Sequence, residues 1–465
     1  MSELDDDPSA QAPQTRPSDP NAALSAAPWP SRASAYYSLF VITVVVMFTV
    51  LDRGVMSLLI EPMKQDFGIS DTEAALLIGS AFSIPYGVIG LAVARFADRG
   101  NRRNLIAVSI AVWSACTVVS GMMQTYLGML IARVGVASGE SSYGPAAWSI
   151  ATDNWPREKV AFATGVMGIG AMVGTALSMF LGGAVLHFVA GMPPIAMPWG
   201  GVIRPWQWAF IVVGIPGLLW TFVVLTTREP PRRGVAAGQK AENVPIRDVV
   251  RWLLNDWRTY LAVLGGTAVK GLMLFAPLTW NATYLHRRFG WELADAGMIY
   301  GTMVLIYSPF SILTGAKLSE ILTRRGRLDA NILIMFVGLC CSVPFMIAGP
   351  LMPTPYLFLA CGAVSGFIGG VGFGPAVAAF QLITPNRMRA QVGGLSQLLN
   401  FLIAWALAPL IVALFTDYLF RDPAKLGYSL VLNAIIIGTL AIIITGQGIR
   451  PYRRSYERAV RDFAN

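Results

Sequence analysis

Twelve apolar stretches, each long enough to cross a lipid bilayer as a helix, constrain this chain more than any other feature. The hydrocarbon core of a bilayer is about 30 Å thick, which takes about 20 helical residues to cross. Only 13% of the 465 residues are charged, against about 25% in an ordinary soluble protein. The chain is therefore predicted to be an all-α integral membrane protein. Its spans are expected near 36–60, 73–95, 104–123, 126–150, 159–189, 206–226, 258–285, 294–321, 330–349, 355–382, 390–416 and 427–448.

The second half of the chain repeats the pattern of the first. Residues 94–98 (Ala-Arg-Phe-Ala-Asp) precede a cluster of arginines, as do residues 316–320 (Ala-Lys-Leu-Ser-Glu). Tyr143-Gly144-Pro145 is likewise echoed by Phe373-Gly374-Pro375. Offsets of 222 to 230 residues indicate two homologous halves. The twelve transmembrane helices should therefore form two pseudo-symmetric six-helix bundles, an arrangement typical of transporters.

The basic charge of the chain, +9 in net, follows the predicted topology. Of the 35 Lys and Arg residues, 26 lie at one end of the predicted helices, 6 at the other end, and 3 within spans. This bias predicts that both termini lie in the cytoplasm. The protein is expected to be a multi-pass protein of the cell (inner) membrane. The predicted parts are a disordered cytoplasmic tail (1–35), an N-terminal bundle (36–227), a cytoplasmic linker with an amphipathic helix (228–257), a C-terminal bundle (258–448) and a basic cytoplasmic tail (449–465).

Cysteine and histidine offer little chemistry. The four cysteines fall within apolar spans, and the two histidines, His187 and His286, are far apart in the sequence. No disulfide framework or zinc-ligand spacing is present in the sequence. We therefore expect no enzyme, no cofactor and no metal site. The expected partners are a small-molecule or lipid substrate, protons and membrane lipid, with no nucleic acid, and the chain is expected to be a monomer.

Five charged residues inside predicted spans are the strongest functional signal: Asp52, Arg53, Arg133, Glu140 and Lys270. Each costs about 2.5–3.5 kcal/mol at the centre of a membrane helix, so they should pair or line a wet cavity. Arg133 and Glu140 are seven residues apart and share one helix face, about 10.5 Å apart. A single helix would thus present an anion-binding group and a protonatable group together.

Structural explanations compete with these roles. Asp52 and Arg53 could form an ion pair near a helix end, and Arg133 could reach toward a membrane face. Lys270 has no matching carboxylate in its own half, and we regard it as a candidate group of the substrate cavity. The duplicated loops are predicted to form a cytoplasmic gate that braces one bundle against the other. The predicted gate residues are Asp98, Arg99, Arg102, Arg103, Glu320 and Arg324.

The loop Ala-Arg-Phe-Ala-Asp-Arg-Gly-Asn-Arg-Arg at 94–103 resembles the loop signature of the major facilitator superfamily (MFS), from which it departs at Ala94 and Asn101. The resemblance covers roughly residues 36–448. Residues 51–53, 133–147 and 153–156 make the chain similar to Spinster-type lipid transporters, most closely a bacterial homologue. This resemblance implies transport of lysolipids or sphingoid phosphates by alternating access. It also implies that the functional polar set is Asp52, Arg53, Arg133 and Glu140.

Two functions follow as expectations. The first is proton-coupled secondary active transport of an amphipathic anion such as a lysophospholipid or sphingoid phosphate. Glu140 and Asp52 would carry the proton, and Arg133 would move between them. The alternative is a drug or organic-anion transporter of the same fold. A cavity for an acyl tail is predicted in the C-terminal half, from Phe275, Trp280, Met298, Met303, Phe310, Phe367 and Phe373.

Overall fold

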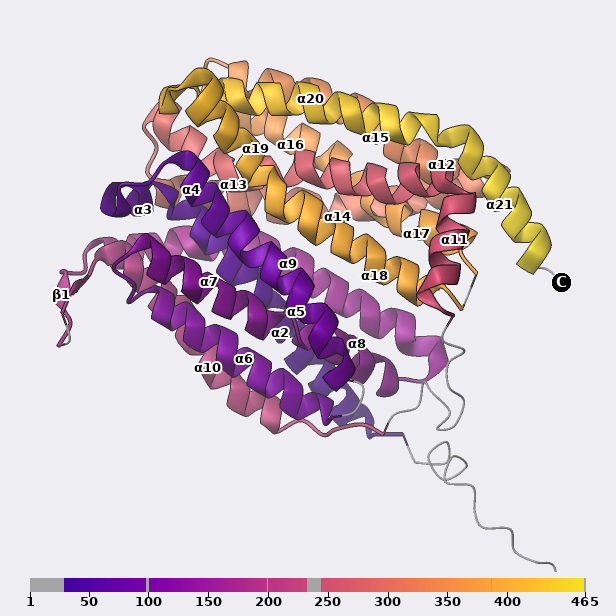
Figure 1. The fold of residues 1–465 in the computed structure, drawn as a ribbon, viewed down its shortest axis with the longest axis horizontal. Coiled ribbons are helices and arrows are strands. Elements are labelled where there is room, and N and C mark those ends of the chain that lie inside the picture. The colour runs from indigo at the N-terminus through magenta and orange to yellow at the C-terminus, as the bar shows by residue number, and fades with distance from the viewer. Residues whose placement is uncertain (1–28, 98–99, 199, 232–243, 386, 464–465) are drawn as a thin grey trace, which may run out of the picture.

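The computed structural model of the chain describes residues 29–97, 100–198, 200–231, 244–385 and 387–463. Two groups of long helices lie one against the other, with the first half of the chain forming one group and the second half forming the other (Figure 1). One end of the helices carries the strands β1 and β2 and is called the hairpin face. The other end carries α11 and the C-terminus and is called the linker face (Figure 1).

The N-terminal bundle contains the first six spans. Its helices are α2 (Arg32–Leu58), α3 (Ile60–Phe67), α4 (Asp71–Ala75), α5 (Ala81–Ala97), α6 (Arg102–Ser120), α7 (Tyr126–Glu140), α8 (Tyr143–Asp153), α9 (Arg157–Ala190) and α10 (Pro205–Leu225). A π-helical segment, Leu76–Ser80, joins α4 to α5 within the second span. Between α9 and α10, the short strands β1 (Ile195–Ala196) and β2 (Val202–Ile203) pair antiparallel. They are the one departure from an all-helical fold within the described residues.

The C-terminal bundle repeats this arrangement. Its helices are α12 (Trp257–Tyr260), α13 (Gly266–Phe289), α14 (Leu293–Arg324), α15 (Ala330–Ala348), α16 (Pro355–Val371), α17 (Phe373–Ile383), α18 (Arg389–Leu399), α19 (Ala406–Leu414) and α20 (Leu426–Gln447). π-Helical segments Leu261–Gly265, Asn400–Trp405 and Phe415–Phe420 interrupt the seventh and eleventh spans. Two 3₁₀ turns, Gly349–Leu351 and Pro423–Lys425, lie near the hairpin face.

Eleven helical stretches of the described chain are long and apolar enough to cross a membrane. The remaining predicted span is the fourth, which is divided between α7 and α8 after Glu140. The matching tenth span is divided at Gly372, between α16 and α17. In both halves the break precedes a proline, Pro145 or Pro375, which lacks the amide hydrogen that a continuous helix would use. The duplicated sequence thus produces duplicated helix breaks.

Two further helices lie outside the spans at the linker face. α11 (Ile246–Asn255) occupies the end of the predicted linker and buries Val249 against the C-terminal bundle. α21 (Ile449–Phe463) continues beyond the last span and buries Tyr452 in the same cluster. Residues 1–28 of the predicted tail and residues 232–243 of the predicted linker lie outside the described residues.

The apolar cores differ between the two faces. Toward the hairpin face, one continuous cluster joins both bundles and includes Leu58 and Met179 from the first and Met273 and Trp280 from the second. Toward the linker face, the N-terminal bundle has a core around Trp113, and the C-terminal bundle has a separate core around Tyr260. Because apolar burial is the main stabilising contact between packed helices, the bundles are joined near the hairpin face and have separate cores near the linker face.

Close backbone packing at Gly139 yields a prediction about stability. A Cβ atom at this position would lie 2.7 Å from the backbone nitrogen of Trp113, whereas a Cβ atom at Gly165 would meet nothing within 4 Å. Gly139→Ala should therefore destabilise the protein by about 1–3 kcal/mol through overpacking. Gly165→Ala should be neutral or slightly stabilising, because alanine favours helix. The midpoint of thermal unfolding in detergent measures both, and equal midpoints would contradict the packing argument.

Candidate functional site

Four of the five predicted intramembrane charges meet in the N-terminal bundle. Asp52 and Arg53 lie on α2, and Arg133 and Glu140 lie on α7. Glu140 is fully buried, Arg133 is 1% exposed, and Asp52 is 6% exposed. Two positive and two negative groups therefore lie where water is largely excluded.

Arg53 is the cation that pairs with Glu140. Its Nη2 donates to Glu140 Oε2. The guanidinium carbon of Arg53 lies 4.4 Å from the ring centre of Phe82, on the same bundle, and 5.3 Å from that of Trp405, on the other bundle. Such cation–π contacts are worth about 0.5–2 kcal/mol each. Arg53 thus connects the buried carboxylate of one bundle to an aromatic wall contributed by both.

Arg133 does not form the ion pair with Glu140 in this structure. Its guanidinium carbon lies 5.3 Å from the ring centre of Phe82, and its Nε and Nη2 atoms are buried without a hydrogen-bond partner. Asp52 accepts a hydrogen bond of 2.9 Å from Thr117 Oγ1. In this conformation Glu140 is therefore paired with Arg53 and not with Arg133, and the predicted movement of Arg133 between Glu140 and Asp52 stays a prediction. The two residues share a helix face, but the first span places Arg53 closer to Glu140.

Two glycines allow the helices that carry these charges to approach their neighbours. Gly139 precedes Glu140 and packs on the backbone of Trp113 in α6. Gly54 follows Arg53, and a Cβ atom there would lie 1.9 Å from Ser178 Oγ of α9. A larger side chain at either position would push the helices apart. The glycines next to Arg53 and Glu140 therefore help to set the positions of these two residues.

A small cavity lies between the two bundles beside Arg53. The N-terminal bundle contributes Arg53, Ser57, Thr175 and Ser178 to its wall, together with the apolar residues Val50, Gly54, Ile78 and Met179. The C-terminal bundle contributes mainly apolar groups, which are Phe275, Leu278, Thr279, Trp405 and Pro409. The one charged residue of the wall, Arg53, and three of its four hydroxyl-bearing residues therefore lie on the N-terminal side, while the C-terminal side is largely apolar.

Lys270 lies apart from this cavity. It is 6% exposed, and a Cβ atom on Gly372 would lie 2.7 Å from its Nζ atom. Gly372 follows the C-terminal end of α16, where a helix dipole favours a cation. This position gives Lys270 a structural role at the break of the tenth span. Its assignment to a substrate cavity remains a prediction.

The residues predicted to hold an acyl tail have different surroundings. Phe275 lines the cavity, while Trp280 is buried and donates its indole N–H to the Pro409 carbonyl at 3.1 Å. Phe310 and Phe373 are exposed and do not line the cavity. A second cavity lies inside the C-terminal bundle and is bordered by Asn281, Tyr300, Tyr307 and Asn433 among others.

The predicted gate residues lie at the linker face, and Asp98 and Arg99 are outside the described residues. Arg102 is buried and bonds within its own half, to Asp153, Ser149, Glu229 and the Pro230 carbonyl. The Arg103 guanidinium bonds to the carbonyls of Leu225 and Thr227. Glu320 bonds to its helix neighbours Lys317 and Arg324. In the part of the chain that the structure describes, these bonds stay within one bundle.

Polar contacts between the bundles gather instead at the hairpin face. Arg287 of α13 donates to Asp71 at 2.6 and 2.7 Å and to Glu61 at 2.7 Å. Asp417, near the end of the eleventh span, accepts from the amide and hydroxyl of Thr72 at 2.7 Å. We call Glu61, Asp71, Thr72, Arg287 and Asp417 the hairpin-face lock.

The sequence analysis missed the hairpin-face lock. Each of its charges lies near a helix end, where charged residues are common and carry no special signal. The only indication was the acidic start of the second span, Asp71-Thr72-Glu73, which reads as an ordinary helix beginning after Ser70.

Comparison with known proteins identifies the family. A family profile for the Major Facilitator Superfamily matches residues 42–409. The chain belongs to the Major Facilitator Superfamily. It is 26% identical over 416 residues to an "MFS-type efflux pump" of Mycolicibacterium smegmatis, covering 89% of this chain and 91% of that protein. It is 22% identical over 329 residues to "Protein spinster" of Drosophila melanogaster, covering 68% of this chain and 52% of that protein.

Solved structures show the same fold. A crystal structure of a bacterial homologue of the human lysosomal transporter Spinster, in an inward-facing and unoccupied conformation, superposes with a TM-score of 0.75. The sequences are 24% identical, and the match covers 93% of this chain and 99% of that one. The predicted MFS fold and the resemblance to Spinster-type proteins are confirmed. The chain is a multi-pass membrane transporter of small-molecule substrates rather than an enzyme.

The buried pair predicts a pattern of stabilities. Arg53→Gln leaves Glu140 without its cation, and removal of one partner of a buried pair costs about 3–5 kcal/mol. The double variant Arg53→Gln with Glu140→Gln removes both charges and should regain most of that loss. Thermal unfolding of detergent-solubilised protein at pH 8 measures the difference, with the exposed Arg324→Gln as control. Equal losses in the single and double variants would contradict the pairing.

Proposed function

We propose that the chain is a proton-coupled secondary active transporter that moves an amphipathic anion by alternating access. The position of Arg53 carries this proposal. Arg53 lines the cavity between the bundles and is also the cation that pairs with the buried Glu140. A substrate anion in the cavity and the Glu140 carboxylate would therefore compete for one guanidinium group.

This competition provides a mechanism for coupling. When a phosphate or carboxylate group of the substrate binds Arg53, Glu140 loses its cation. A buried carboxylate without a nearby cation favours its protonated form. Substrate and proton would then bind together and cross the membrane in the same direction. Arg133, whose Nε and Nη2 atoms lack partners in the described structure, would supply a second cation to the head group or to Asp52.

The orientation of the protein in the membrane is inferred from the distribution of its basic residues. Because Lys and Arg gather at the linker face, we assign that face and both termini to the cytoplasm. The separate cores at that face then correspond to an inward-facing conformation. The hairpin-face lock would hold the external side closed. In the opposite state, the loops containing Asp98 and Glu320 would brace the cytoplasmic side.

The two-sided cavity supports an amphipathic substrate such as a lysophospholipid or sphingoid phosphate. Arg53 and the hydroxyl groups of the N-terminal bundle suit an anionic head group. Phe275, Leu278 and Trp405 of the C-terminal bundle suit an alkyl chain. Similarity to proteins named Spinster agrees with this substrate class. Similarity to an efflux pump favours the alternative, a drug or organic anion.

A substrate screen in proteoliposomes tests the substrate class. The protein is reconstituted with and without an imposed pH gradient and supplied with labelled lysophospholipids, sphingoid phosphates and compact organic anions. Accumulation of single-chain anionic lipids that increases with the gradient is the expected result. Uptake of compact hydrophilic anions alone would favour the alternative function.

The coupling mechanism predicts separate effects for two residues. Glu140→Gln should abolish gradient-driven accumulation while leaving substrate binding and passive exchange measurable, because the amide neither binds a proton nor holds Arg53 as strongly. Arg133→Ala should reduce both binding and accumulation, by about tenfold or more for a charged contact worth about 1.5–3 kcal/mol. Asp248→Asn, which changes an exposed carboxylate of α11 outside both the site and the predicted gate, serves as the control.

Retention of full pH-dependent accumulation by Glu140→Gln would refute a coupling role for this residue. Coupling would then depend on Asp52 or on no proton. Normal binding in Arg133→Ala would remove Arg133 from the substrate site.

The hairpin-face lock predicts a shift in conformation. Arg287→Ala removes the bonds to Asp71 and Glu61 and should increase the population in which the hairpin face is open. Inward- and outward-facing states need differ by only a few kcal/mol, so loss of one buried network can reverse their order. Paired spin labels on the hairpin-face ends of α3 and α13 measure the distances, with the exposed Arg251→Ala of α11 as control. Identical distance distributions in parent and Arg287→Ala would contradict the assignment.

A further inference from the structure

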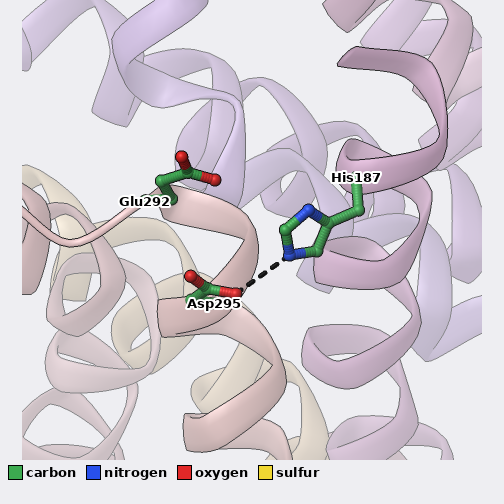
Figure 2. A group of neighbouring side chains, drawn as sticks. All are labelled: His187, Glu292 and Asp295. Carbon is green, nitrogen blue, oxygen red and sulfur yellow. Dashed lines mark hydrogen bonds and ion pairs between the residues drawn. The ribbon is translucent and has the colours of Figure 1, made fainter. Parts of the chain in front are cut away.

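His187, Glu292 and Asp295 converge at the hairpin face, outside the site described above. His187 lies near the end of α9, while Glu292 and Asp295 lie at the start of α14 (Figure 2). His187 Nε2 is 2.9 Å from Asp295 Oδ1. One nitrogen or oxygen atom from each of the three residues lies within 4.8 Å of the other two.

We propose that these three residues bind a divalent transition-metal ion, with Zn²⁺ as the best fit. One imidazole nitrogen and two carboxylates are ligands that Zn²⁺ accepts at about 2.0–2.2 Å, and water can complete the tetrahedron. Ligand atoms of such a tetrahedron are about 3.4 Å apart. In the structure His187 Nε2 and Asp295 Oδ1 are 2.9 Å apart, and all three ligand atoms lie within 4.8 Å of one another. Ca²⁺ and Mg²⁺ fit less well, because they prefer oxygen ligands only.

The backbone holds the three ligands in place. A Cβ atom on Gly183, one turn from His187, would lie 2.3 Å from the carbonyl oxygen of Ala294. α9 and α14 are therefore in direct backbone contact beside the cluster. Glu292 is the N-cap residue of α14 and Asp295 lies in its first turn, so both carboxylates belong to the start of this helix. The Glu292 side chain makes no capping hydrogen bond to its own helix, which leaves its carboxylate available as a ligand.

The cluster is also accessible to ions. The His187 and Asp295 side chains are 45% and 50% exposed. An ion can reach them from the hairpin face without passing through the cavity between the bundles. Metal binding at this cluster consequently does not depend on the transport mechanism proposed above.

The three ligands come from different bundles, so metal binding should affect the equilibrium between the open and closed states of the hairpin face. His187 belongs to the N-terminal bundle, and both carboxylates belong to the C-terminal bundle. An ion that needs all three ligands binds only when the hairpin face is closed, and it stabilises that state by its differential affinity. Zn²⁺ should therefore inhibit the transport cycle. This second step, unlike the binding itself, rests on the alternating access proposed above.

Titration with Co²⁺ as a spectroscopic probe tests the binding. The full-length protein in detergent, with any polyhistidine tag removed, should develop the visible absorption of tetrahedral Co²⁺ and lose it when Zn²⁺ is added. His187→Gln and Asp295→Asn should each weaken Co²⁺ binding by at least about tenfold. His286→Gln is the matched control, because His286 lies outside the cluster and bonds through Nδ1 to the Trp291 carbonyl at 2.8 Å. Equal affinity of parent and His187→Gln, or no signal at about 1 mM Co²⁺, would overturn the site.

Spin-label distances across the hairpin face test the consequence for conformation. Zn²⁺ should increase the closed population in the parent and in His286→Gln, and should leave the distribution of His187→Gln unchanged. If Co²⁺ binds as expected but Zn²⁺ leaves the parent distances unchanged, the metal site stands and its coupling to the transport cycle is refuted. Thermal unfolding of His187→Gln and Asp295→Asn checks that both variants fold.

Discussion

A carboxylate in the middle of a membrane helix costs about 2.5–3.5 kcal/mol unless a cation faces it, and Arg53 provides that cation for Glu140. The residues beside the pair are glycines, Gly54 and Gly139, which let α2 pack closely on α9 and α7 pack closely on α6. Arg53 in turn contacts Trp405 of the other bundle and lines the cavity between them. One guanidinium group thus links the buried acid, the bundle interface and the proposed substrate.

The two bundles are joined more extensively at the hairpin face than at the linker face. In the proposed mechanism this difference corresponds to a closed hairpin face and an open linker face. Near the hairpin face, a shared apolar core and the hairpin-face lock join the two halves. Near the linker face, each half has its own core, and the basic loop residues of the described chain bond within one bundle. A motion that opens the hairpin face must separate Arg287 from Asp71 and His187 from Asp295. Both pairs therefore report on the same conformational change.

Four charged residues of the candidate site could be predicted from the sequence on the basis of membrane energetics. Asp52, Arg53, Arg133 and Glu140 stand out because charges are costly within apolar spans, and the structure brings these four together. The partner of Glu140 could not be predicted from the sequence. Helix spacing indicates only which residues share a face of α7, and Arg53 belongs to another span. The twelve spans were predictable because each is a continuous apolar stretch, and the two halves were predictable because the same motifs occur in both.

Contacts between distant segments were missed for the same reason. Arg287 and Asp71 lie 216 residues apart, and His187 and Asp295 lie 108 apart. Each residue alone looks like an ordinary charge near a helix end. The prediction of no metal site rests on the small number of histidines, whereas the site proposed above would need one histidine and two carboxylates from a second helix.

The proton balance of substrate binding tests the central claim most directly. Lysophospholipid is added to the purified protein in weakly buffered solution near neutral pH, and the protons exchanged per lipid bound are measured. Competition between substrate and Glu140 for Arg53 predicts uptake of about one proton in the parent and none in Glu140→Gln. Proton release, or the same uptake in both proteins, would contradict the account.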